Sequence, residues 1–169
     1  MIVKNDLYDY PNRYIYQDDK GFKFSLDSIL LAEFAFFKEN NKKVLDLCSG
    51  NASVPLIMSC YNHSQYIGFE IQKEVYDLGV ESIRINKVNN ITLINDDINN
   101  ISKYYSKNEF DYVTCNPPFF KVSDSKVINK NISKSIARHE LYLKLEDIFL
   151  IASKYFPCIH TCRFTIEQP

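Results

Sequence analysis

Short apolar segments alternate with longer segments of helical periodicity from residue 43 onwards, and this alternation restricts the fold more than any other feature. The first apolar segment, KVLDLC, is followed by a helical segment, and the pattern then repeats. Buried strands that alternate with helices form mostly parallel sheets with helices on both faces. The sequence therefore predicts an α/β fold with a Rossmann-like, doubly wound, mostly parallel sheet. The expected strands are 43–48, 65–70, 91–95 and 110–115, and the expected helices are 51–60, 72–87 and 145–155.

The residues before this alternation, 1–41, form an N-terminal extension of the expected single domain. Tyr14–Tyr16 and Phe22–Phe24 flank a turn that contains Gly21, a pattern that predicts a hairpin. A helix is expected over 26–37. Its apolar side consists of Leu26, Ile29, Leu30 and Phe34.

Composition and charge exclude several classes of protein. The 169 residues, with 46% apolar and 24% charged side chains, are ordinary for one globular domain. The net charge of −1 means that any contact with nucleic acid must come from a local basic patch. The segment Met1–Asp6 has no signal-peptide character, and the longest apolar stretch, 29–37, is too short to cross a bilayer. The five cysteines have no disulfide-framework spacing, so we expect a cytoplasmic protein without membrane association.

Polar residues follow all four expected strands. Asp46–Ser53 follows the first, Glu70 the second, Asp96 and Asp97 the third, and Asn116 the fourth. Ligands of doubly wound sheets bind beyond the carboxyl ends of the strands, where the strand order reverses. We therefore expect the functional site at this edge of the sheet.

The loop after the first strand and Glu70 together indicate a cofactor that carries a nucleoside. Glu70 follows Gly50 at the spacing of about 20 residues that is typical of an acid binding both ribose hydroxyls. The loop has one glycine where a dinucleotide fingerprint has three, which argues against a pyrophosphate. A cofactor with an adenosine and a small charged tail fits this pattern, and S-adenosylmethionine is one.

The segment NPPF, residues 116–119, predicts a site for a planar amine. The exocyclic amine of a nucleic-acid base is a poor nucleophile, because its lone pair is delocalised into the ring of the base. The side-chain oxygen of Asn116 and the carbonyl of Pro117 can each accept one amine hydrogen, which aims the lone pair at the methyl group. Phe119 can stack on the base, worth about 1–3 kcal/mol. If the fourth strand lies next to the first, positioning at the cofactor carries the reaction without a strong base.

Five segments together resemble the bacterial tRNA (adenine-N6) methyltransferases, class I S-adenosylmethionine-dependent enzymes that modify valine tRNA beside the anticodon. NPPF alone is shared by several methylases, whereas its combination with FSLDS and ARHE is more specific. The resemblance implies methyl transfer from S-adenosylmethionine to the N6 amine of an adenine in tRNA. The five segments are 21–35, 44–59, 67–72, 111–120 and 136–148.

The resemblance also implies roles for individual residues. Asn116, Pro117 and Phe119 would hold the target base and carry catalysis, with Pro118 beside them. The cofactor-binding residues would be Asp46, Ser49 and Gly50 in the loop, Glu70 at the ribose and Asp97 at the adenine.

The sequence departs from the family at two places. Ala52 stands where the family usually has a second loop glycine. After Tyr155 the pattern of the family is lost, so we expect the core to be 42–155 and the tail 156–169 to be atypical. This predicts that the last strands of the sheet are missing and that the chain is a truncated product with impaired activity.

The segment 121–139 carries one acid, Asp124, and several basic residues. Beside NPPF these residues could bind tRNA phosphates, and a merely solvated loop is the alternative. Cys158, His160 and Cys162 lack a fourth ligand and zinc-knuckle spacing, so no metal is expected. The basic residues are Lys121, Lys126, Lys130, Lys134 and Arg138.

Two other functions remain open at this point. The same motif could hold a glutamine side chain of a translation factor or the N2 amine of guanine in ribosomal RNA. Alternatively, a truncated fold could bind S-adenosylmethionine or RNA without turnover.

Overall fold

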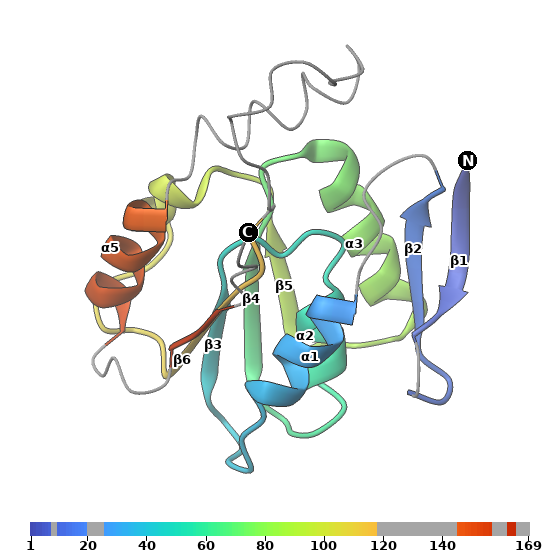
Figure 1. The fold of residues 1–169 in the computed structure, drawn as a ribbon, viewed down its shortest axis with the longest axis horizontal. Coiled ribbons are helices and arrows are strands. Elements are labelled where there is room, and N and C mark those ends of the chain that lie inside the picture. Colours follow the sequence, from blue (N-terminus) through green and yellow to red (C-terminus); the bar gives the residue numbers. More distant parts are fainter. Residues whose placement is uncertain (8–9, 20–25, 118–144, 157–161, 165–169) are drawn as a thin grey trace.

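The main sheet has five parallel strands in the order β5-β4-β3-β6-β7 (Figure 1). The structure is a computed structural model. It describes residues 1–7, 10–19, 26–117, 145–156 and 162–164. The strands of this sheet are β3 (Lys43–Asp46), β4 (Gln65–Phe69), β5 (Ile91–Ile94), β6 (Tyr112–Cys115) and β7 (Cys162–Phe164).

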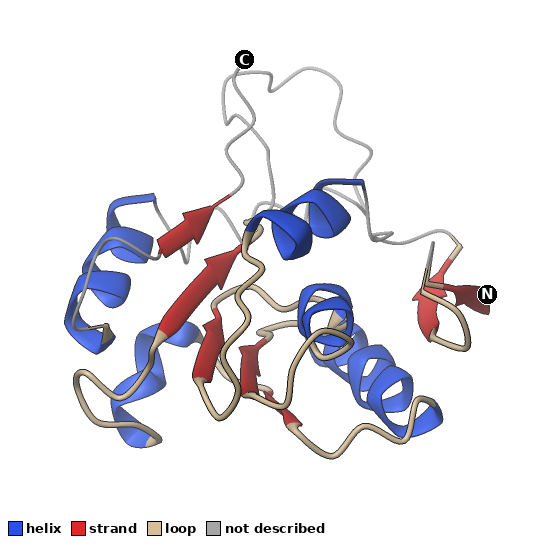
Figure 2. Cartoon of the chain, turned by 90° about the horizontal axis from the view of Figure 1, so that it is seen from below, coloured by secondary structure: helices blue, strands red, loops and turns tan. Residues whose placement is uncertain are grey.

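Helices cover both faces of the sheet (Figure 2). Val44 of β3 belongs to the core on one face, whereas the next residue, Leu45, belongs to the core on the other face. This alternation follows from the strand period of two, and it explains why the strands are apolar throughout. The first face carries α1 (Leu26–Phe34), α2 (Ser53–Met58) and α3 (Lys73–Ile85), and the second carries the 3₁₀ helix η1 (Ile98–Lys103) and α5 (Leu145–Tyr155).

The predicted α/β class is confirmed, and each of the four predicted strands and three predicted core helices is present. The tail holds an element that the sequence did not indicate. Cys162–Phe164 forms β7, which pairs in parallel with β6 and adds a fifth strand to the sheet.

The N-terminal hairpin consists of β1 (Ile2–Asp6) and β2 (Tyr14–Asp18), which pair antiparallel. The sequence did not indicate β1 as a partner of β2, and the predicted partner, Phe22–Phe24, lies outside the described part of the chain. Leu7 and Ile15 are fully buried in the same core cluster as residues of α1 and α2, so burial ties this hairpin to the domain.

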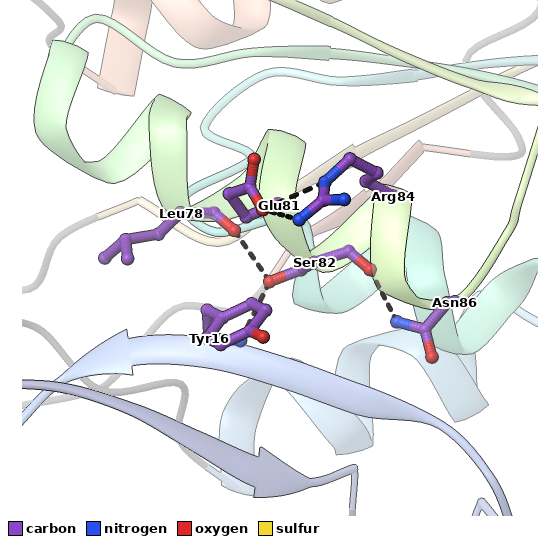
Figure 3. A network of polar contacts seen from close by, with 6 residues as sticks. All are labelled: Tyr16, Leu78, Glu81, Ser82, Arg84 and Asn86. Carbon is purple, nitrogen blue, oxygen red and sulfur yellow. Dashed lines mark hydrogen bonds and ion pairs between the residues drawn. The ribbon is translucent and has the colours of Figure 1, made fainter.

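Strand β2 packs along α3 through side chains of that helix (Figure 3). The backbone N–H of Leu7 donates to the carbonyl of Arg13, and that of Asp19 donates to the carbonyl of Met1. In an antiparallel pair only every second residue bonds to the partner strand, so the backbone groups of Tyr14 and Tyr16 point away from β1. The N–H of Tyr16 donates to Ser82 Oγ at 2.9 Å. The N–H of Tyr14 donates to Asn86 Oδ1 at 2.9 Å, and Asn86 Nδ2 donates back to the Tyr14 carbonyl at 2.6 Å. Side chains at α3 therefore satisfy backbone groups of β2 that a neighbouring strand would otherwise bond.

Helix α1 turns most of its predicted apolar side outward, and of the four predicted residues only Ile29 packs against the core. Leu26, Leu30 and Phe34 are 66%, 54% and 63% exposed. The side chains that pack inward are those of Ser28, Leu31 and Ala32, which share one face of the helix. The helix is apolar on more than one side, so the strongest apolar stripe did not identify the buried face.

No helix in the described residues has the length and apolar character needed to span a lipid bilayer.

Candidate active site

The carboxyl ends of β3 and β6 lie side by side at the centre of the sheet. Asp46, the last residue of β3, pairs with Thr114 of β6 on one side and with Gly68 of β4 on the other. The chain leaves β3 for β4 in one direction and later reaches β6 in the other, so the strand order reverses here. The expectation that the fourth predicted strand lies next to the first is confirmed. This brings the loop after β3 and the NPPF segment to one edge of the sheet.

The loop after β3, residues 47–52, turns sharply under the control of two residues with positive φ. Gly50 has a φ of 57° and Ala52 a φ of 68°. A Cβ atom added to Gly50 would meet no atom within 4 Å, so the space beside this residue is open. Ala52 is buried in the left-handed conformation that a glycine adopts without strain, which accounts for the glycine of the family at this position.

Three buried polar atoms at the end of β3 and in this loop make no hydrogen bond of good geometry among the described residues, although the Ser49 hydroxyl is near enough to Asp46 to favour its ionised form. They are Asp46 Oδ2, Ser49 Oγ and Asn51 Oδ1. Buried polar groups are nearly always paired, and unpaired ones point to a water or ligand that completes them. The loop therefore fits a small polar ligand that approaches the backbone at Gly50.

Glu70 follows β4 and faces the same loop. Its Oε2 accepts the backbone N–H of Gly50 at 3.0 Å, and its Oε1 accepts that of Gln72 at 2.7 Å. A carboxylate has about four lone-pair sites, so each oxygen can accept a further hydrogen bond. Burial raises the pKa of Glu70 to about 7, against the opposing effect of the two N–H groups.

Asp46 is a second buried acid at the same edge. It is 2% exposed, and its Oδ1 accepts from the hydroxyl of Thr114 at 2.7 Å. Burial raises its pKa to about 6, although the Thr114 hydroxyl favours the ionised form. The charge of Asp46 also contributes to the raised pKa of Glu70. The two carboxyls therefore titrate close to neutral pH, which is common in functional sites.

Asp97 lies after β5, where it caps η1. Its Oδ1 accepts from the backbone N–H and from the side-chain amide of Asn99, both at 2.9 Å. This contact gives Asp97 a local role in ending β5 and starting η1. Its role toward an adenine stays a prediction.

Asn116 is the first residue after β6, and its side chain contacts α1. Its Nδ2 donates to the hydroxyl of Ser28 at 3.1 Å. Just before it, Cys115 Sγ lies 3.9 Å from Cys48 Sγ in the loop after β3. The loop after β3 therefore contacts the last residue of β6, directly before NPPF.

The remaining predicted site residues lie outside the described part of the chain. The described residues contain no cluster of three side chains that could hold a metal ion. Pro117 is the last described residue of the motif. The residues outside are Pro118, Phe119, Lys126, Lys130, Lys134 and Arg138.

Two residues of the site were missed by the sequence interpretation. Ser28, which contacts Asn116, belongs to FSLDS, a segment in which no residue was given a role in the site. Asn51, next to Gly50, donates from Nδ2 to the carbonyl of Tyr16 at 3.0 Å and so joins the loop to the hairpin. The only signal for Asn51 was its place between two small residues in a turn.

Comparison with protein families identifies the class. The family described as methyltransferase domain matches residues 38–155, which is more than half of the chain. The chain belongs to this methyltransferase domain family, and its sheet has the Rossmann-like fold of class I methyltransferases. The resemblance in the sequence is confirmed at this level.

Two curated relatives differ in the substrate that their names state. A tRNA1(Val) (adenine(37)-N6)-methyltransferase of Cytophaga hutchinsonii is 20% identical over 152 residues, which are 89% of this chain and 62% of that protein. A release factor glutamine methyltransferase of Buchnera aphidicola is 28% identical over 109 residues, which are 62% of this chain and 37% of that protein. The chain thus spans less than two thirds of the length of either relative.

Among solved structures, M. jannaschii TYW2 in complex with AdoMet is similar to this chain. The TM-score is 0.57 at 17% identity, and the match covers 90% of this chain and 72% of that one. At this identity the similarity concerns the fold.

Proposed function

We propose that the chain transfers a methyl group from S-adenosylmethionine to the exocyclic N6 amine of an adenine in tRNA. The observation that carries the proposal is the pairing of β3 with β6, which brings Asn116 beside the loop after β3. One contact region then contains both a cofactor loop and an acceptor for an amine hydrogen.

The residues around the loop suit S-adenosylmethionine. Glu70 would accept the two ribose hydroxyls with the lone pairs that Gly50 and Gln72 leave. Ser49 and Asp46 would contact the amino-acid part of the cofactor, and the open space beside Gly50 allows its close approach. Asp97 would face the adenine. When bound, S-adenosylmethionine would supply an electrophilic methyl group; its S–methyl bond would break as the N–methyl bond forms, S-adenosylhomocysteine would leave, and the amine would release one proton to solvent.

Asn116 and Pro117 would position the amine. The Asn116 side-chain oxygen and the Pro117 carbonyl each accept one hydrogen of the amine, so the nitrogen moves towards tetrahedral geometry and its lone pair is less delocalised into the ring. Both acceptors are part of a short, stiff segment at the end of a buried strand, so they need no rearrangement during the reaction. Phe119 would stack on the base, and the basic residues of 121–139 would bind tRNA phosphates.

The relatives support two substrates to different extents. The match to the tRNA methyltransferase covers 89% of this chain, whereas the match to the glutamine methyltransferase covers 62%. The wider coverage favours the tRNA. The higher identity of the second relative, 28%, keeps a glutamine side chain as the alternative substrate.

The test is methyl transfer from labelled S-adenosylmethionine to two substrates offered separately. One is total tRNA from a host that lacks the tRNA adenine-N6 methyltransferase, and the other is an unmethylated release factor. We expect label in the tRNA, recovered as N6-methyladenosine after digestion to nucleosides, and none with Asn116→Ala. Label in the release factor alone, or in N2-methylguanosine, would refute the proposed substrate.

A further inference from the structure

We propose that Ser28 of α1 is a positioning residue for the reaction, because it fixes the orientation of the Asn116 side-chain amide. The amide Nδ2 donates to Ser28 Oγ at 3.1 Å, across 88 residues of sequence. This inference rests on the proposed function, since it concerns the amide that would accept the amine hydrogen.

The position of Ser28 is well defined by its surroundings. Its side chain is 1% exposed, and it lies on the same face of α1 as Leu31 and Ala32, which are buried in the core. A hydroxyl on a packed helix keeps its place better than one on a loop, because the helix backbone cannot move without opening the core. Asn116 therefore has a fixed partner on one side.

The orientation of the amide matters because its two ends have opposite hydrogen-bonding character. The nitrogen has two donor hydrogens, and the oxygen is an acceptor. Because the amide nitrogen of Asn116 points to Ser28, the amide oxygen points to the opposite side of the planar amide group. Rotation of the amide by half a turn would present N–H groups to the amine, and two donors would then face each other. In the observed arrangement the Ser28 hydroxyl is the acceptor, and this contact holds the amide with its nitrogen, not its oxygen, directed to α1.

Kinetics of Ser28→Ala test this role. The variant removes the oxygen without adding volume, and we expect kcat to fall about tenfold, since the amide spends part of its time in unproductive orientations. The KM for tRNA and the affinity for S-adenosylmethionine should stay within about twofold, because the contact orients a group that acts mainly in the transition state.

Ser82→Ala is the matched control (Figure 3). Ser82 is also a fully buried helix serine that accepts a hydrogen bond, from the N–H of Tyr16, but it contacts the hairpin rather than Asn116. We expect Ser82→Ala to lower the melting temperature at least as much as Ser28→Ala while kcat is kept. Equal losses of kcat in both variants would reduce the role of Ser28 to general stability and overturn the inference.

A second measurement is independent of turnover. The side-chain amide of Asn116 gives a pair of proton–nitrogen resonances, identified by their loss in Asn116→Asp. We expect Ser28→Ala to move the bonded proton upfield, and Ser82→Ala to leave both in place. An unchanged pair, or an unchanged kcat, contradicts the inference.

The two proposals fail separately. If the wild type methylates a release factor and not tRNA, the proposed substrate is wrong, and the same Ser28→Ala comparison is made with that protein as substrate. If the wild type methylates neither, the proposed function fails, and the Asn116 resonances alone decide whether Ser28 holds the amide.

Discussion

At the scale of single residues, Glu70 combines burial with hydrogen bonds that favour its charge. The protein interior raises its pKa, and the N–H groups of Gly50 and Gln72 oppose this effect. Ribose hydroxyls would add two more donors to the ionised form. Binding of the proposed cofactor should therefore favour the deprotonated carboxylate.

The affinity for S-adenosylmethionine should rise as the pH increases from 6 to 8. Glu70 has a pKa of about 7 in the free protein, so at pH 6 a bound proton must first leave, and at pH 8 it has already left. Glu70→Gln should weaken binding by about 1–3 kcal/mol and flatten this pH dependence. Isothermal titration calorimetry at three pH values measures both. An affinity that is constant with pH in the wild type would remove Glu70 from the site.

Asn116 is the second residue whose proposed role can be tested alone. Asn116→Ala should lower kcat about 100-fold or more and change KM far less, because the contact forms mainly in the transition state. An aspartate at this position keeps an acceptor oxygen and can accept from the Ser28 hydroxyl, so partial activity is expected. Measurements of kcat, KM and the melting temperature of both variants distinguish the proposed catalytic role of Asn116 from a role in forming the turn. In the turn-forming role, the loss of activity would only follow the loss of stability.

At the scale of elements, the attachment of the hairpin to α3 depends on two short side chains, Asn86 and Ser82. Asn86 alone satisfies both backbone groups of Tyr14. The loss of such a partner leaves buried donors and acceptors unpaired, which costs more than the bonds contribute.

Asn86→Ala should therefore lower the free energy of unfolding by about 1–3 kcal/mol. Hydrogen exchange at the amides of Tyr14 and Tyr16 should accelerate, while exchange in β3 and β6 changes only with global stability. Asn90→Ala is a suitable control, since Asn90 donates to the Ser64 carbonyl away from the hairpin. If the two variants have the same exchange at Tyr14, the docking role is wrong.

The sequence predicted elements better than it predicted their contacts. The core strands could be read because each is an apolar run between helical segments. Strand β7 has three residues, too few to show a period. The partner of β2 is β1, which is mostly polar and at most half-buried and so was not recognised as a strand, and α1 is apolar on two sides. The ends of the strands could be predicted as the site, but the contact of Ser28 with Asn116 could not, because no local pattern links residues that distant.

At the scale of the whole molecule, one site contains two acids with raised pKa values, and this affects the stability of the entire fold. Asp46 ionises near pH 3.8 when unfolded and near 6 when folded, and Glu70 near 4.5 and near 7. Between about pH 4 and 7 the folded state therefore binds more protons than the unfolded state. The stability that these groups contribute is complete below this range and is lost as the pH rises through it.

The ligand-free protein should thus be less stable at pH 8 than at pH 5, by an amount on the order of 1–3 kcal/mol. Acids whose pKa is lowered, such as Asp96 and Glu109, act in the opposite direction, but only at lower pH. Urea unfolding at the two pH values measures the difference, and Glu70→Gln should reduce it. Equal stability at both pH values would mean that the two carboxyls are ionised in the folded protein.

The side of β2 that faces α3 bears on aggregation as well as on stability. Strand edges with free backbone groups are templates on which other chains can add a strand. Here Asn86, Ser82 and Asn51 occupy the backbone groups of Tyr14 and Tyr16, so no further strand can pair at these two residues. Protection of this edge lasts only while the hairpin stays on the helix. Opening of the hairpin would therefore expose the backbone groups of Tyr14 and Tyr16, on which a second copy of the chain could add a strand.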